Sequence, residues 1–187
     1  MSQLDFSTTL GNAWFPTPIF TASGCASSGK ELAQFFDLRD MGAIVTKSIM
    51  TKPRAGRATP RMAETPSGML NSIGLQGPGI DAFLANDLAW LVEQKARIIV
   101  SIAGETVEEF ASLARRLRGV AGISALEVNI SCPNVENRGM VFACHLESAQ
   151  TVIEGVRRTI GGDLPIIAKL SPDVTDIVSI ARGVIAA

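Results

Sequence analysis

A short polar segment in the second half of the chain contains the residues best suited to chemistry. Residues 129–134 read Asn-Ile-Ser-Cys-Pro-Asn and directly follow the strand-like run 125–128. Pro133 restricts the backbone of this segment, and small polar residues flank Cys132. A cysteine just past the end of a buried strand would present a reactive thiol at the rim of a parallel sheet.

Cys132 allows three interpretations. It is an inert buried thiol, the commonest fate of a free cysteine, or a covalent nucleophile, or a general acid or base. A nucleophile normally needs a histidine base, and nothing in the sequence places the only histidine, His145, beside Cys132. Within this polar segment we favour proton abstraction by Cys132, with Ser131 and Asn129 or Asn134 orienting the substrate.

Polar residues also follow the other strand-like runs. Ligands of parallel α/β folds bind beyond the carboxyl ends of the strands. Lys47 and Lys169 each close an apolar run, so the pair would stabilise an anionic or electron-rich ring, such as a reduced flavin or a carboxylate substrate. The alternative is that both lysines extend into solvent. The remaining polar or small residues at these ends are Thr21, Ala22, Ser23, Gly24, Ser48, Ser101 and Asn129.

A glycine-rich segment at 71–79 has no phosphate-loop spacing, so it does not predict nucleotide phosphate binding. Its glycines permit close approach of the backbone to a ligand, and Asn71 is then a plausible contact to a planar polar substrate. A tight turn is the alternative.

Five strand-like runs alternate with helical stretches, which predicts an α/β fold with a parallel sheet. A closed (β/α)₈ barrel needs about 250 residues, so the units form either an open doubly wound sheet or part of a barrel. Thr106 and Glu109 have capping-box spacing. The strands are expected at 18–22, 43–47, 97–101, 125–129 and 165–169, and the helices at 30–40, 81–94, 106–119, 148–160 and 174–187.

Other local patterns carry smaller predictions. The proline- and glycine-rich stretch 51–71 predicts a long irregular connection of the kind used as a lid or binding loop. Asp81 and Asp87 occupy positions that favour a helix start. Trp14 and Trp90 lie in apolar surroundings, which predicts core positions.

Composition favours one compact, cytosolic domain over residues 1–187. Apolar residues make up 47% of the chain, and 17 basic residues nearly balance 18 acidic ones, so there is no charge field to attract nucleic acid. We expect no membrane span, because there is no apolar run of about 18 residues. Three cysteines without paired spacing suggest neither a disulfide framework nor a zinc site.

From residue 15 onward the sequence resembles the dihydroorotate dehydrogenases, flavoenzymes of pyrimidine synthesis built on a (β/α)₈ barrel that holds FMN. The ordered set of motifs is far more specific than any one of them. These are Thr-Ala-Ser-Gly at 21–24, Thr-Lys-Ser at 46–48, Asn-Ser-Ile-Gly-Leu at 71–75, Asn-Ile-Ser-Cys-Pro-Asn at 129–134 and Ala-Lys-Leu-Ser-Pro at 168–172.

The resemblance implies a set of FMN contacts, in which Lys169 stabilises negative charge on the isoalloxazine. Ser101 stands where the NAD-linked branch usually has an asparagine, and a shorter donor would act through water. The implied FMN-binding residues are Ala22, Ser23, Gly24, Lys47, Ser48, Ser101, Asn129 and Lys169.

The resemblance also implies the substrate contacts and the chemistry. Cys132 would remove the C5 proton of dihydroorotate while C6 delivers a hydride to FMN, and a cysteine rather than a serine marks the soluble class. The implied substrate-binding residues are Lys47, Asn71, Ile73, Gly74, Leu75, Asn129 and Asn134.

The stretch Leu-Gln-x-Pro-Gly at 75–79 is similar to the two-subunit, NAD-linked branch. That branch implies a partner subunit carrying FAD and a [2Fe–2S] cluster, and a homo-oligomeric assembly. The chain ends after the fifth predicted helix, whereas the family has three further strands. We therefore expect the isolated 187-residue chain to bind FMN poorly or not at all, and flavin absorbance at full occupancy would contradict this.

Two other functions remain open from the sequence. The pyrimidine-reducing domain of dihydropyrimidine dehydrogenases shares the Asn-x-Ser-Cys-Pro motif and the stretch at 174–182. A catalytically incomplete fragment that acts only by association through open sheet edges is the non-enzyme alternative.

Overall fold

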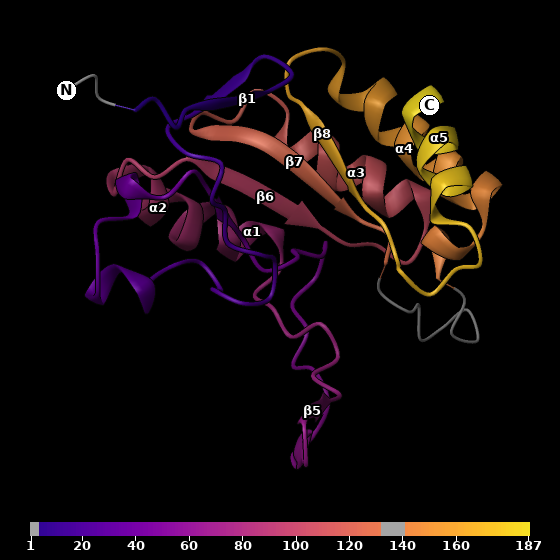
Figure 1. The fold of residues 1–187 in the computed structure, drawn as a ribbon, viewed down its shortest axis with the longest axis horizontal. Coiled ribbons are helices and arrows are strands. Elements are labelled where there is room, and N and C mark those ends of the chain that lie inside the picture. Colours follow the sequence, from indigo (N-terminus) through magenta and orange to yellow (C-terminus); the bar gives the residue numbers. More distant parts are fainter. Residues whose placement is uncertain (1–3, 132–140) are drawn as a thin grey trace.

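The computed structural model describes residues 4–131 and 141–187. Its centre is a parallel sheet of four strands in the order β3, β6, β7, β8, and the helices α3, α4 and α5 lie on one side of it (Figure 1). A doubly wound sheet reverses its strand order at a switch point, and the described strands show no reversal. The four strands are β3 (Ile44–Val45), β6 (Ile98–Ile102), β7 (Ile123–Asn129) and β8 (Ile166–Lys169).

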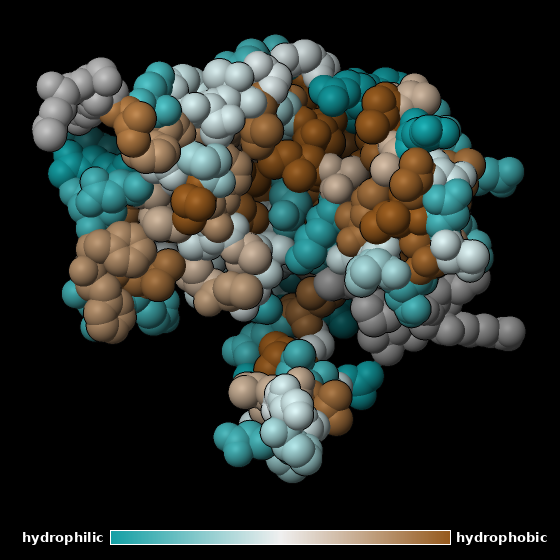
Figure 2. All heavy atoms as spheres, in the orientation of Figure 1, coloured by the Kyte–Doolittle hydropathy of each residue, from teal (hydrophilic) through white to brown (hydrophobic). Residues whose placement is uncertain are grey.

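The two faces of the sheet have different covers. Ile98 and Val100 belong to the large core cluster shared with the helices, whereas Ile99 belongs to a smaller cluster around Phe15. This alternation follows the two-residue period of a strand. Phe15 comes from an antiparallel hairpin of β1 (Thr8–Leu10) and β2 (Ala13–Phe15). Figure 2 shows apolar residues gathered near the middle of the viewed face, over β7 and β8.

The long helices confirm three of the five helical predictions. Thr106 accepts a hydrogen bond from the backbone N–H of Glu109 at 3.2 Å, as a capping residue should. The Glu109 carboxylate accepts from the N–H of Glu105 at 2.7 Å, one residue earlier than a capping box requires. The three helices are α3 (Val107–Leu117), α4 (Leu146–Ile160), which follows the short turn η4 (Phe142–Cys144), and α5 (Ile177–Ala186).

The helix predicted at 81–94 is present but interrupted. It consists of α1 (Ile80–Ala82), a π-helical stretch η3 (Phe83–Leu88) and α2 (Ala89–Glu93). Asp87 lies inside η3 rather than at a helix start, so that prediction was wrong.

The prediction of a helix at 30–40 is wrong. The region forms two separate 3₁₀ turns, η1 (Leu32–Gln34) and η2 (Leu38–Asp40). Asp37 is extended and caps the second turn by accepting from the Arg39 N–H at 2.9 Å, which breaks the helix. The Arg39 guanidinium and N–H lower the pKa of Asp37 to about 2. This cap is therefore fully effective above the ordinary carboxyl pKa and is lost as the pH falls toward 2.

The strand predicted at 18–22 is reduced to a single parallel bridge between Phe20 and Ala43. The side chain of Thr21 explains the short pairing. Its hydroxyl accepts from the Val45 N–H at 2.8 Å, so a side chain takes the place of a backbone carbonyl in the ladder.

The connection at 51–71 is more regular than predicted. It contains an antiparallel hairpin of β4 (Met62–Thr65) and β5 (Gly68–Asn71), which we call the arm. The arm projects away from the body of the protein and carries exposed apolar residues (Figures 1 and 2).

The two tryptophans differ from each other. Trp90 is partly buried against the core. Trp14 is 48% exposed, which contradicts its predicted core position, and the Arg97 guanidinium lies 5.0 Å from its ring centroid. Within the described ranges, no helix has the length and apolar character needed to cross a membrane.

Gly42 provides a test of the packing that joins the first strand segment to the sheet. A Cβ at Gly42 would collide with the carbonyl oxygen of Thr17 and the ring of Phe20. We expect Gly42→Ala to lower the free energy of unfolding by about 1–3 kcal/mol in urea titrations. Gly162→Ala is the control, because its Cβ would meet nothing within 4 Å. Equal stability of the two variants would contradict the packing described here.

Candidate active site

An extra residue after β3 shapes the candidate site. Val45 pairs with Ile99, and Ile49 pairs with Ile102, so the segment following β3 is one residue longer than its partner in β6. This is a bulge, which commonly redirects side chains beside active sites. The backbone N–H of Lys47 leaves the sheet ladder and donates to a loop carbonyl at 2.9 Å.

A cavity of about 740 Å³ lies at the carboxyl ends of the strands. Loops that follow β3, β6 and β7 meet there, as the chain order of a parallel sheet requires. Eight residues that the sequence predicted as ligand contacts line this cavity. They are Ser23, Gly24, Lys47, Asn71, Ile73, Gly74, Leu75 and Asn129.

Lys169 lies beside the cavity. Its ammonium donates to the Ser23 hydroxyl at 2.8 Å, and Ser23 lines the cavity. The two predicted lysines, Lys47 and Lys169, therefore reach the same end of the sheet, and both are only partly exposed.

Ser48 and Ser101 lie behind the cavity rather than on its wall. Their hydroxyl oxygens are 2.9 Å apart, and the side-chain amide of Asn129 donates to Ser48 at 2.8 Å. Ser101 is completely buried and Ser48 is 5% exposed. The structure thus joins these predicted residues to Asn129 rather than to the cavity space.

The remaining predicted residues are not part of the described cavity. Ala22 is exposed and precedes the lining residues. Cys132 and Asn134 lie outside the described residues.

Sequence reasoning missed an ion pair on the cavity wall. The Arg54 guanidinium donates to the Glu105 carboxylate at 2.6 Å, and the two side chains are 35% and 22% exposed. Arg57 also lines the cavity, together with Met62 and Met69 of the arm. The basic residues of the 51–71 stretch were the only available signal, because ion pairing across 51 residues leaves no pattern in a single sequence.

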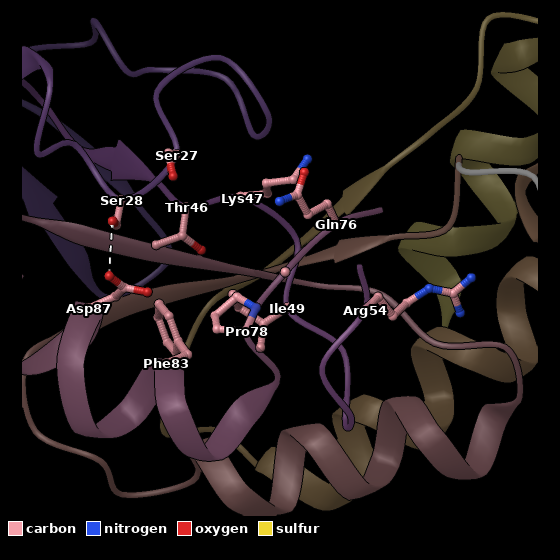
Figure 3. Close-up of a pocket in the computed structure, with 11 residues that line it drawn as sticks. Ser27, Ser28, Thr46, Lys47, Ile49, Arg54, Gln76, Pro78, Phe83 and Asp87 are labelled. Carbon is pink, nitrogen blue, oxygen red and sulfur yellow. Dashed lines mark hydrogen bonds between the residues drawn. The ribbon is translucent and has the colours of Figure 1, made fainter. Parts of the chain in front are cut away.

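A smaller cavity of about 490 Å³ adjoins this site and shares Lys47 and Arg54 with it. Lys47, Gln76 and Arg54 line this smaller cavity, and Figure 3 shows the Arg54 side chain pointing away from the other two. At the other end, Asp87 accepts from Ser28 at 3.2 Å and from Lys30 at 2.9 Å.

The backbone of the main cavity is shaped for close approach. Gly24 has φ of +87°, with open space on the side where a Cβ would stand. Leu75 has φ of +52°, a conformation that is rare for a bulky residue and that clusters at ligand sites. Cationic, amide and apolar groups around such a space suit a flat molecule with anionic groups.

Comparison with known proteins shows that this chain belongs to the dihydroorotate dehydrogenase family. The family model described as dihydroorotate dehydrogenase matches residues 5–187. Several curated relatives carry the name dihydroorotate dehydrogenase B (NAD(+)), catalytic subunit. The protein from Geobacter sp. (strain M21) is 44% identical over 183 residues, covering 98% of this chain and 59% of its own length.

The relative from Desulforudis audaxviator (strain MP104C) is 51% identical over 164 residues, which are 88% of this chain and 53% of that protein. The relative from Anoxybacillus flavithermus (strain DSM 21510 / WK1) is 46% identical over 167 residues, 89% of this chain and 53% of that protein. The chain spans little more than half the length of these relatives.

Thiol labelling tests the description of the cavity wall. Cys25 is exposed and lines the cavity, whereas Cys144 is partly buried, with its sulfur 3.5 Å from the carbonyl oxygen of Asp173. We expect Cys25 to react several-fold faster than Cys144 with a thiol-specific reagent, because access limits the reaction of an ordinary thiol. Cys25→Ser should remove the faster of these two phases, and Cys144→Ser should leave it. Survival of that phase in Cys25→Ser would contradict the exposure of Cys25.

Proposed function

We propose that this chain forms the FMN- and substrate-binding part of a dihydroorotate dehydrogenase catalytic subunit, which oxidises dihydroorotate to orotate in pyrimidine biosynthesis. The observation that carries the proposal is the convergence of eight predicted ligand residues on one cavity. They come from segments between residues 23 and 129, and they meet where the carboxyl ends of the parallel strands face the segment at 71–75. The names of the relatives support the same activity.

The described residues fit FMN. Gly24 leaves open space beside the backbone, and Lys169 provides a cation at the sheet edge through its bond to Ser23. When bound, FMN would supply the hydride acceptor. We propose that Ala22, Ser23, Gly24 and Lys169 hold it, and that the Lys169 ammonium stabilises negative charge on the ring.

The substrate would lie against the segment that follows the arm. We propose that Asn71 and the backbone of residues 73–75 bind the orotate ring and its carboxylate. Lys47 would serve substrate and flavin together, because the bulge after β3 directs it to the cavity. Asn129 would present its amide to both ligands, and Asn134 would add a substrate contact.

We propose that Cys132 is the base of the reaction. It would take the C5 proton of dihydroorotate as the C6 hydrogen leaves with its electron pair, so that a C5–C6 double bond forms. The supporting observation is its place in the chain, three residues beyond Asn129, which lines the cavity. General acid–base catalysis of this kind contributes about 10²–10⁴-fold to the rate.

We also propose that these residues are part of one barrel-shaped domain with the (β/α)₈ fold. Strands in chain order with helices on one face are the winding of a barrel. On β7, one carboxylate oxygen of Glu127 is buried and has no hydrogen-bond partner among the described residues. Buried carboxylates are nearly always bonded, so this oxygen supports further structure against the inner face.

The names of the relatives include NAD(+) and catalytic subunit, which supports a separate electron-transfer subunit. We propose that this partner carries FAD and a [2Fe–2S] cluster, and that the catalytic chain is cytoplasmic and homo-oligomeric.

Replacement of the proposed base tests the mechanism. In the full-length protein, we expect Cys132→Ala to lower kcat with dihydroorotate by about 10²–10⁴-fold while FMN absorbance remains. Cys144→Ala is the matched control and should turn over normally. Unchanged kcat in Cys132→Ala would refute the assignment of the base.

Substrate choice separates the proposal from its nearest enzyme alternative. We expect the full-length protein to oxidise dihydroorotate and to leave dihydrouracil unchanged under steady-state assay. A carboxylate would explain the difference, because the cationic Lys47 faces the cavity and dihydrouracil lacks that group. Turnover of dihydrouracil alone would overturn the proposed substrate.

A further inference from the structure

Both ends of the Asn129 side-chain amide are engaged by serines. Its oxygen accepts from the Ser131 hydroxyl at 2.9 Å and from the Ser131 backbone N–H at 3.3 Å. Its nitrogen donates to the Ser48 hydroxyl at 2.8 Å. A backbone N–H can only donate, so the amide oxygen must face Ser131 and the nitrogen must face Ser48. One of the two flipped orientations of Asn129 is therefore selected chemically.

Ser48 is in turn held by Ser101. The two hydroxyl oxygens are 2.9 Å apart inside the protein. Ser101 is itself fixed, because its N–H donates to the Thr46 hydroxyl at 3.1 Å and its carbonyl accepts from the Ile49 N–H at 2.8 Å. The Thr46 hydroxyl thus accepts from the Ser101 N–H, which has lost its ladder partner at the bulge after β3. Ser101 is completely buried, so its hydroxyl does not reach the cavity.

We propose that Ser48 and Ser101 are positioning residues that hold Asn129 in the orientation required for ligand binding, and that Ser101 contacts no ligand. This inference rests on the proposed function, in which Asn129 contacts FMN and substrate. The sequence predicted that Ser101 contacts the flavin through water. In the structure, Ser101 instead bonds Ser48, whose hydroxyl bonds the Asn129 amide.

The Ser131 backbone N–H can only donate, so it selects one of the two flipped states of the Asn129 amide. The Ser48 hydroxyl accepts from the amide nitrogen of that state, and this second bond limits the rotation of the side chain. Loss of the Ser48 hydroxyl removes an acceptor that the amide nitrogen uses. Loss of the Ser101 hydroxyl leaves that acceptor in place but less restrained, so its effect should be smaller. A supporting residue of this kind changes ligand binding through geometry.

The experiment measures Asn129 directly in the full-length protein. Selective ¹⁵N-asparagine labelling would follow the hydrogen exchange of the Asn129 side-chain amide in wild type, Ser48→Ala and Ser101→Ala. The same variants would be assayed for KM and kcat with dihydroorotate. Ser28→Ala is the matched control, because Ser28 is a buried serine whose hydroxyl bonds Asp87 at 3.2 Å, outside this network.

We expect Ser48→Ala to raise the exchange rate and the KM about tenfold, and Ser101→Ala about threefold, as the loss of one hydrogen bond implies. Ser28→Ala should change neither quantity. A KM increase with little change in kcat indicates altered binding geometry, whereas a purely structural defect would lower the active fraction at constant KM.

Wild-type exchange and KM in Ser101→Ala would overturn the proposal. If the full-length protein does not oxidise dihydroorotate at all, the proposed function fails, and the exchange of the Asn129 amide still decides whether the two serines position it.

Discussion

Parallel pairing in chain order is the constraint on which the rest of this structure depends. Because β3, β6, β7 and β8 run in the same direction and neighbour one another in sequence, every segment that follows a strand emerges at the same edge. Residues as distant as Ser23 and Lys169 come within hydrogen-bonding distance there. The sheet is stabilised by apolar burial against the helices on one face. The carboxyl ends of its strands are therefore not needed for the core and can carry polar groups.

Because the segment after β3 has one extra residue, three neighbouring side chains point in different directions and make different contacts. Thr46 completes the hydrogen bonds of the interrupted ladder, Lys47 reaches the cavity, and Ser48 contacts Asn129. A regular strand would direct alternate side chains to opposite faces without this division. The bulge therefore lets one segment of the sheet place Lys47 at the cavity while Thr46 and Ser48 keep hydrogen bonds inside the protein.

The opposite wall of the cavity is built from a different kind of structure. The arm and the backbone turn at Gly74 and Leu75 contribute no residue to the described core clusters, and the turn depends on local geometry, including the left-handed conformation of Leu75. The Arg54–Glu105 ion pair joins this wall to the segment after β6. Binding residues are often carried by loops that a rigid scaffold positions, and this cavity has that arrangement.

The sequence by itself determined the class of fold, the three long helices and eight of the residues that line the cavity, because strand-end motifs and hydrophobic periodicity are local signals. Two predictions failed for different reasons. The stretch 30–40 has helical character, but a local cap, in which Asp37 accepts from the Arg39 N–H, divides it into two short turns. Trp14 has the character of a core residue, but it lies at the surface beside Arg97, a neighbour distant in sequence. Only the tertiary structure decided that Ser101 serves Asn129 through Ser48. Ser48 is 53 residues from Ser101 and 81 residues from Asn129 along the chain, and parallel pairing together with the bulge after β3 brings the three side chains together.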